Sequence, residues 1–229
     1  MEEARAYEEL RVAFTAAVSH ELRTPLARLM ALLESASLPD ADVPALLDQA
    51  RAQVEAMREL VDDVLFLSEL ESGREVVALG STPVRPVLED VLGRFADSAE
   101  RADVSIVLEC DDDVELPLRR RMLQTMVENL VANAIQYAGP GATLTLSARP
   151  GRLEAADDGH GVEDEELSRL FERFYRGDRA RASRGTGLGL AIVKHVVVAA
   201  GGAVEASGGP GRGLHVVCRF PRNGPGRVS

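Results

Sequence analysis

Two stretches of the chain repeat apolar residues at spacings of three and four. The first stretch, from Glu2 to about Ser35, has no glycine and one proline, and its series is Val18, Leu22, Leu26, Leu29 and Leu33. The second series is Leu47, Ala50, Val54, Met57, Val61 and Val64. This spacing lines one face of an α-helix. We therefore predict two long helices, each with a continuous apolar seam.

The segment between them, "SASLPDADVP", contains the turn and helix-start residues Pro39, Asp40 and Pro44. A short loop makes the two helices an antiparallel hairpin. Because two helices alone do not cover both seams, we predict that the α-helical hairpin forms a dimeric four-helix bundle. The alternative is a monomeric hairpin packed on its own second domain.

The sequence becomes mixed α/β after Gly73, which we interpret as a helix C-cap. Its patterns predict strands at 76–79, 104–110, 142–148, 153–156, 203–207 and 214–220, and helices at 83–102, 118–138, 163–171 and 188–200. We predict one domain over 1–73, a second over 76–222, and a disordered Pro- and Gly-rich tail over 223–229.

The composition limits the function classes. A formal net charge of −11 argues against non-specific binding of nucleic acid, so a site for a polyanion needs locally concentrated positive charge. Cys110 and Cys218 lack metal-like spacing, which predicts two buried thiols in a reducing compartment. No apolar run reaches membrane-spanning length. Since the acidic N-terminus starts in the middle of a helical pattern, we expect the cytoplasmic part of a longer protein, with a sensor or membrane segment upstream.

Two motifs of the second domain carry polar groups suited to a ligand. "ENLVANAIQYA" places Asn129 and Asn133 on one helix face, where amides cost free energy unless they hydrogen-bond. "DDGHG" places Asp157 after a strand, where its carboxylate could accept a hydrogen bond from an exocyclic amine. Taken alone, the first motif is more typical of amides that cap or bridge neighbouring loops, and the second is more typical of a loop with turn residues.

A third motif, "RGTGLGLAIV", leads through three glycines into an apolar helix, whose first N–H groups suit phosphate. It lacks the context of a Rossmann fingerprint and the Lys-Ser/Thr ending of a Walker loop. The arginines before it supply the expected local positive charge: Arg173, Arg176, Arg179, Arg181 and Arg184. They fit either a solvated basic loop or a lid over a triphosphate.

In this order, "SHELRTPL", "NLVANAIQY", "DDGHG", "FERFYR" and "GTGLGLAIVK" resemble the catalytic core of bacterial sensor histidine kinases, from about Phe14 to Phe220. The resemblance implies a homodimeric histidine-phosphotransfer domain, then an α/β two-layer sandwich of the gyrase, Hsp90, histidine kinase and MutL type. It implies ATP and Mg²⁺ as cofactors and a response regulator receiver domain as partner. We expect no nucleic acid and no membrane contact by this part of the protein.

The resemblance also implies roles for single residues. His20 would be the phospho-acceptor, Glu21 the acid that orients and deprotonates it, and Thr24 a residue that aligns water for dephosphorylating the regulator. Asn133 would bind Mg²⁺, and Arg176 would stabilise the γ-phosphate. The remaining nucleotide-binding residues would be Asn129, Tyr137, Asp157, Gly159, Gly161, Gly185, Gly187, Leu188 and Gly189.

One position separates this chain from the related ATP hydrolases, and two others depart from the usual pattern of the histidine kinases. Asn129 stands where related ATP hydrolases carry a water-activating glutamate, so we expect ATP to be held without hydrolysis. Gln136 replaces a common Lys or Arg, and His160 replaces a common proline. The alternatives are a degenerate kinase that only binds nucleotide, a chaperone-type ATPase, and a kinase whose phosphatase activity dominates.

Overall fold

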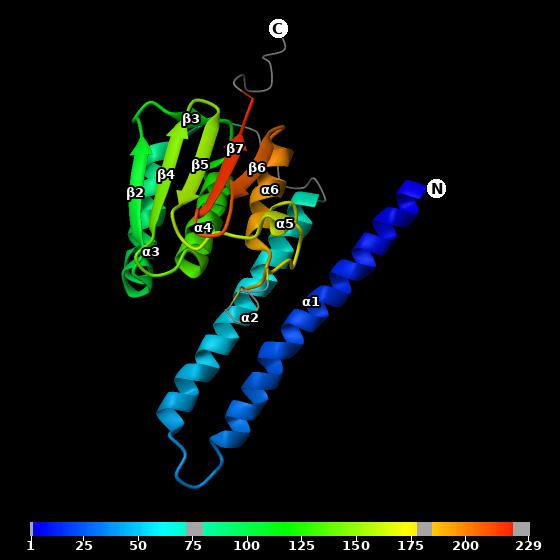
Figure 1. The fold of residues 1–229 in the computed structure, drawn as a ribbon. Coiled ribbons are helices and arrows are strands. Elements are labelled where there is room, and N and C mark those ends of the chain that lie inside the picture. Colours follow the sequence, from blue (N-terminus) through cyan, green and yellow to red (C-terminus); the bar gives the residue numbers. More distant parts are fainter. Residues whose placement is uncertain (1, 72–79, 178–184, 222–229) are drawn as a thin grey trace. The chain divides into compact units, whose positions relative to one another are not determined.

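The computed structural model describes residues 2–71, 80–177 and 185–221 (Figure 1). The chain divides into two compact units, Met1–Ser68 and Glu69–Ser229, and each is described by itself. Four predictions lie outside the described residues: the cap at Gly73, the domain boundary at 73–76, the strand at 76–79 and the tail at 223–229.

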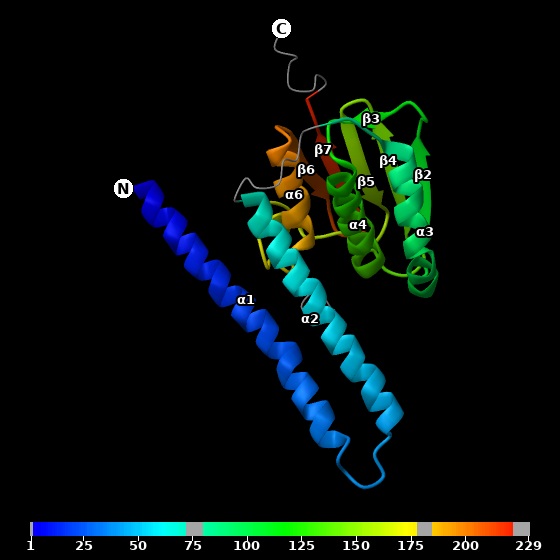
Figure 2. The same cartoon turned by 180° about the vertical axis from the view of Figure 1, so that it is seen from behind.

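The first unit is built from the helix α1, Glu2–Ser35, and the helix α2, Val43–Glu71. They run antiparallel and are joined by residues 36–42 (Figures 1 and 2), as the two seams predict. The backbone N–H of Ala45 donates to Asp42 Oδ1 at 3.2 Å, which supplies a partner for the first turn of α2. α1 continues past Pro25 as a single helix.

The apolar seams of this unit remain exposed in the single chain. Leu26 and Leu33 of α1 are 49% and 52% exposed, and Leu47 and Val54 of α2 are 50% and 53% exposed. Apolar side chains exposed in rows of this kind are typical of a protein interface. None of the helices in the described ranges combines the length and apolarity that a membrane crossing requires.

The second unit is a two-layer α/β sandwich, as predicted. Its sheet has the order β2-β4-β5-β7-β6, in which β2 and β4 are parallel and every other neighbouring pair is antiparallel. The strands are β2 Ser105–Cys110, β4 Thr143–Arg149, β5 Arg152–Asp157, β6 Ala203–Gly208 and β7 Leu214–Arg219. The helices α3 Val84–Ala102, α4 Arg120–Tyr137 and α6 Gly189–Ala199 all cover one face of the sheet (Figures 1 and 2).

The core lies between the sheet and these helices. In β4 and at the start of β5 every second residue is buried, as at Leu144, Leu146 and Leu153, whereas β7 buries Val216, Val217 and Cys218 in succession. α6 contributes Ile192, Val193, Val196 and Val197, which are fully buried. Cys110 and Cys218 are buried free thiols, as predicted, and burial raises the pKa of Cys218 to about 12.

Two predictions of secondary structure were wrong. The helix expected at 163–171 is only one turn, α5 Asp164–Leu167, opened by a capping box between Glu163 and Glu166. The chain then turns, and Phe174, whose φ is 60°, donates its N–H to the carbonyl of Gly187 in the glycine-rich loop, residues 185–189. The paired two-residue strands β1 Thr82–Pro83 and β3 Glu115–Leu116 were missed, since two residues cannot show an alternation.

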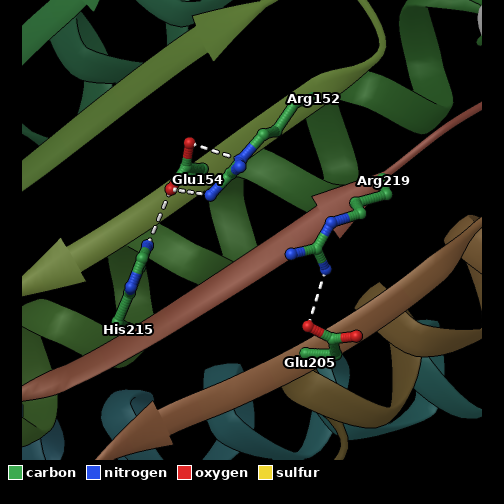
Figure 3. A network of polar contacts seen from close by, with 5 residues as sticks. All are labelled: Arg152, Glu154, Glu205, His215 and Arg219. Carbon is green, nitrogen blue, oxygen red and sulfur yellow. Dashed lines mark hydrogen bonds and ion pairs between the residues drawn. The ribbon is translucent and has the colours of Figure 1, made fainter.

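The face of the sheet opposite the helices carries a polar network (Figure 3). Glu154 Oε1 and Oε2 lie 2.6 Å from Arg152 Nε and 2.9 Å from Arg152 Nη2, and His215 Nε2 lies 2.8 Å from Oε2. Arg219 Nη1 donates to Glu205 Oε2 at 2.6 Å on the neighbouring strands. Burial raises the pKa of Glu154, but the hydrogen bonds from Arg152 and His215 outweigh it, so the net pKa is lowered.

We predict that Glu154→Gln lowers the free energy of unfolding by about 1 kcal/mol at neutral pH, a modest value because both partners are partly solvated. Because the pKa of Glu154 is lowered in the folded state, its ionised carboxylate stabilises the fold at pH values above its ordinary pKa of 4.5. This stabilisation is lost as the pH falls through the folded-state pKa. The loss caused by the substitution should therefore shrink below pH 4.5. Urea denaturation of the unaltered chain and the variant, at neutral pH and below pH 4.5, measures the free energy of unfolding.

The matched control is Glu205→Gln, since Glu205 pairs with Arg219 but its side chain is 67% exposed. We expect almost no change in stability for this variant. An equal loss in both variants, or a loss for Glu154→Gln that does not depend on pH, would contradict the assignment.

Candidate functional site

His20 lies on the exposed side of α1. Its side chain is 74% exposed, and its Nδ1 is 3.6 Å from Glu21 Oε1. Thr24, one helical turn further along, is also exposed, whereas Leu22 and Leu29 of the seam are partly covered. The helix thus presents the imidazole, a carboxylate and a hydroxyl to solvent within one turn and a half.

Asn129, Asn133 and Tyr137 form a stripe along α4 at intervals of four residues, and all three are half-buried. Asn129 Nδ2 donates to the carbonyl of Thr125 at 2.8 Å, which fixes the amide on its own helix. Within the described part of the chain, no hydrogen bond holds the amide of Asn133. Its oxygen and nitrogen are therefore available to a ligand.

Asp157 stands at the end of β5, and one of its oxygens is already occupied. Its Oδ1 accepts from the backbone N–H groups of Gly159, at 3.0 Å, and Leu214, at 3.3 Å. Burial raises the pKa of Asp157, and these two hydrogen bonds only partly offset it. Among the described residues no group donates to the second oxygen, Oδ2, so this oxygen can accept from a ligand.

Gly159 and Gly161 pack against protein backbone. A Cβ at Gly159 would collide with the carbonyl oxygen of Ala138, and one at Gly161, whose φ is 68°, would collide with that of Gly209. These close contacts hold the loop after Asp157 between the end of α4 and the turn that joins β6 to β7. The glycines therefore place the carboxylate through backbone packing, a role that the motif alone did not indicate.

His160 contributes a contact that the sequence did not reveal. Both its backbone N–H, at 2.9 Å, and its Nδ1, at 2.6 Å, meet the carbonyl oxygen of Ala138. Because a carbonyl oxygen only accepts, Nδ1 must carry a proton. The side chain therefore ties the Asp157 loop to the residue that directly follows Tyr137.

The glycine-rich loop runs along the α4 stripe. A Cβ at Gly185 would lie 3.0 Å from Tyr137 Oη, and a Cβ at Gly189 would lie 2.7 Å from Asn129 Oδ1. Leu188 is buried, and its N–H donates to Thr186 Oγ1 at 3.2 Å just before α6 begins. The N-terminus of α6, with its free N–H groups and positive dipole end, therefore faces the same stripe.

The segment before this loop is anchored to it. Phe174 N–H donates to the carbonyl of Gly187 at 2.9 Å, and a Cβ at Gly187 would lie 2.9 Å from the Phe174 backbone. Arg176 is half-buried two residues further on. Arg179, Arg181 and Arg184 lie outside the described residues.

These groups form one site in the second unit. Its amide stripe, second carboxylate oxygen, helix N-terminus and nearby arginine suit a nucleotide, with the phosphates at α6 and an amine at Asp157. Within the described residues, no group of three or more His, Cys, Asp or Glu side chains is arranged to hold a metal ion. The unengaged amide of Asn133 fits Mg²⁺, which commonly takes one or two protein oxygens and completes its shell with phosphates and water.

Two family models match the chain in the same order as the two units. Residues 10–73 match the His Kinase A (phospho-acceptor) domain, and residues 119–224 match the histidine kinase-, DNA gyrase B-, and HSP90-like ATPase. The chain belongs to the sensor histidine kinases of two-component systems. This family accounts for both an exposed histidine in the first unit and a nucleotide-type site in the second.

Individual relatives agree with the family assignment. The sensor-like histidine kinase SenX3 of Mycobacterium tuberculosis is 34% identical over 93% of this chain, which spans 54% of SenX3. The solved structure of Acinetobacter baumannii histidine kinase AdeS is 28% identical, with a TM-score of 0.72 over 89% of this chain and 98% of AdeS. Histidine kinase ThkA in complex with response regulator protein TrrA has a TM-score of 0.73 at 19% identity, covering 99% of this chain and 66% of ThkA, which shows a shared fold.

We predict that Asp157→Asn weakens ATP binding about 10- to 100-fold, because the new amide places either a donor toward the base amine or a donor toward Gly159 and Leu214. The variant should also lose its preference for ATP over inosine triphosphate, which lacks the amino group. Calorimetric titration with both nucleotides measures the two effects.

Asp158→Asn is the control, since exposed Asp158 accepts from Thr143 N–H at 2.6 Å through an oxygen that an amide retains. This variant should keep both affinity and preference. If Asp157→Asn still favoured ATP over inosine triphosphate to the same degree, Asp157 would not accept a hydrogen bond from the adenine amino group.

Proposed function

We propose that this chain catalyses ATP-dependent autophosphorylation of His20 and transfers the phosphoryl group to an aspartate of a response regulator receiver domain. The observation that carries the proposal is the exposed imidazole with Glu21 at its Nδ1, in a chain whose second unit offers a nucleotide-type site. The domains would be 1–73 for phosphotransfer and 76–222 for ATP binding. The family membership supports both halves.

Glu21 would set the tautomer of His20. A carboxylate beside Nδ1 favours the form that carries its proton there, which leaves the lone pair on Nε2. This lone pair attacks the γ-phosphorus as the bond to the ADP oxygen breaks, and Glu21 takes up the Nδ1 proton as the N–P bond forms. The phosphoramidate can then pass its phosphoryl group to a carboxylate.

The second unit would hold and orient ATP. Asp157 Oδ2 accepts from the adenine amino group, Tyr137 flanks the base, and Asn133 supplies an oxygen to Mg²⁺. Bound Mg²⁺ would neutralise phosphate charge during transfer. Asn129 and the start of α6 contact the phosphates, and Arg176 stabilises charge that develops on the γ-phosphate. The backbone that lines the bound nucleotide would come from Gly159, Gly161, Gly185, Gly187, Leu188 and Gly189.

Asn129 favours a kinase over an ATP hydrolase. Its amide is not a base, and its Nδ2 is committed to the Thr125 carbonyl, so it cannot activate water. Glu128 is occupied elsewhere, with its Oε1 2.6 Å from Arg94 Nη1. A degenerate nucleotide-binding module is the second candidate, but the presence of His20, Glu21, Asn133 and Asp157 favours chemistry.

The exposed seams support a homodimer. Apolar residues on both helices, including Leu26, Leu33, Leu47 and Val54, would be covered in a four-helix bundle of two hairpins. ThkA, which shares the fold, is bound to a response regulator in its structure. Together with the family membership, this similarity supports a receiver domain as partner.

We predict that His20→Ala and Asn133→Ala each incorporate no acid-labile, base-stable phosphate from labelled ATP, because one lacks the acceptor and the other the Mg²⁺ ligand. Incorporation by the unaltered chain is the positive control, and Gln124→Ala on the same helix should retain it. Full labelling of Asn133→Ala would contradict the role of Asn133. Steady ATP hydrolysis that survives His20→Ala would favour the hydrolase alternative.

A mixture of these two variants tests the dimer. Each variant supplies what the other lacks, so phosphate on the Asn133→Ala chains would show that one copy phosphorylates its partner. Chromatography of the mixture by size establishes whether dimers are present.

We predict that Thr24→Ala slows dephosphorylation of the regulator about tenfold or more while sparing autophosphorylation, because the hydroxyl would align the attacking water. The assay follows labelled phosphate on the regulator after ATP is removed. Arg23→Ala, at an exposed neighbouring position, is the control and should change neither rate. Equal loss of both activities in Thr24→Ala would argue against a specific role in hydrolysis.

A further inference from the structure

A contact between Arg173 and His195 joins the segment before the glycine-rich loop to helix α6. Arg173 Nη2 lies 3.2 Å from His195 Nε2, and the two residues are 22 positions apart in the sequence. Neither residue has a role in the function proposed above. His195 is half-buried and sits on the helix whose N-terminus faces the phosphate region.

The other ring nitrogen fixes the direction of this hydrogen bond. His195 Nδ1 lies 2.9 Å from the carbonyl oxygen of Ala191, which can only accept, so Nδ1 carries the proton. Nε2 of the neutral ring then offers its lone pair to the guanidinium N–H of Arg173. Burial lowers the pKa of His195, and the charges of Arg173 and Lys194 lower it further, against the opposing effect of the Ala191 bond. The neutral ring is therefore the favoured form.

The backbone next to Arg173 has its own anchor. Phe174 adopts a φ of 60°, which is rare for a residue with a side chain, and its N–H donates to the Gly187 carbonyl at 2.9 Å. Such a conformation persists only where the surroundings enforce it. The segment is thus held at adjacent residues by two different elements, through a side chain on α6 and through the backbone on the glycine-rich loop.

A third contact holds the next residue. The guanidinium of Arg169 lies 4.3 Å from the centre of the Tyr175 ring, and Tyr175 Oη donates to Glu166 Oε1 at 3.4 Å. Arg176 directly follows this anchored run. A group meant to stabilise developing charge must be placed before the reaction, because reorganisation at that moment costs rate.

We propose that His195 is a positioning residue for phosphoryl transfer, which acts by accepting a hydrogen bond from Arg173 and so fixes the segment that carries Arg176. This inference rests on the role proposed for Arg176 in the autokinase reaction. His195 touches neither the nucleotide nor His20 in this account. Its effect should therefore appear in the rate of transfer more than in the binding of ATP.

The test uses the full chain and four variants. His195→Leu removes the acceptor, and His195→Gln keeps one, since its amide oxygen can reach the position of Nε2. Arg173→Met removes the donor, and the double variant His195→Leu/Arg173→Met removes both. His215→Leu is the matched control, because His215 is a half-buried histidine on the opposite face of the sheet, paired with Glu154.

We expect His195→Leu to lower kcat for autophosphorylation about tenfold, the order of effect of losing a hydrogen bond to a charged group. The dissociation constant for ATP should change less than about twofold. His195→Gln should recover most of the rate, and the double variant should be no slower than the slower single variant, since the two residues act as a pair. His215→Leu should leave kcat unchanged.

Three results would overturn the proposal: an unchanged kcat in His195→Leu, a rate in His195→Gln as low as in His195→Leu, or additive losses in the double variant. Circular dichroism reports whether each variant folds, and if His195→Leu does not, Arg173→Met and Arg173→Lys decide, with Lys expected to recover part of the rate. If the unaltered chain places no phosphate on His20, the proposed function fails first. Normal labelling with unaffected variants removes only the role of His195.

Discussion

The geometry of the second unit depends on α4, which has one apolar, buried face and a half-buried polar stripe formed by Asn129, Asn133 and Tyr137. Its buried side chains include Met122, Leu123, Met126, Val127, Leu130 and Val131. Complete burial of a side chain of this size contributes about 1.5–3 kcal/mol. A helix held by several such contacts cannot rotate without exposing them. The core therefore fixes the orientation of Asn129, Asn133 and Tyr137, and the loops of the site assemble around this stripe.

The loops reach the stripe through close backbone packing. Gly159 meets the carbonyl of Ala138, and Gly187 meets the backbone of Phe174, at separations that leave no room for a side chain. Backbone contacts of this kind have no rotamers to lose and little freedom to shift. Glycine in this site therefore brings rigid segments together, in addition to any space it leaves for a ligand.

The long elements could be predicted from sequence because their signals are local and repeated. The seams gave α1 and α2, and the alternation of Leu144 with Leu146 gave β4. The motif order pointed to the site. The clamp of His160 on Ala138 and the bond of Arg173 to His195 span 22 residues each, and no periodic pattern encodes them. The shortened α5 has the same explanation, because the helix is followed by a contact between Phe174 and Gly187 that no local pattern in residues 168–171 encodes.

The exposure of His20 has a chemical consequence of its own. A nucleophile buried in the nucleotide pocket would react with ATP but could not then present its phosphoryl group to a second protein. At 74% exposure, on a helix of a separate unit, the imidazole can meet first a phosphoryl donor and later an aspartate acceptor. The same exposure gives His20 no enclosed site that would raise its reactivity. In the reaction proposed for this chain, activation would come from its neighbour Glu21, whose Oε1 lies 3.6 Å from Nδ1 of His20.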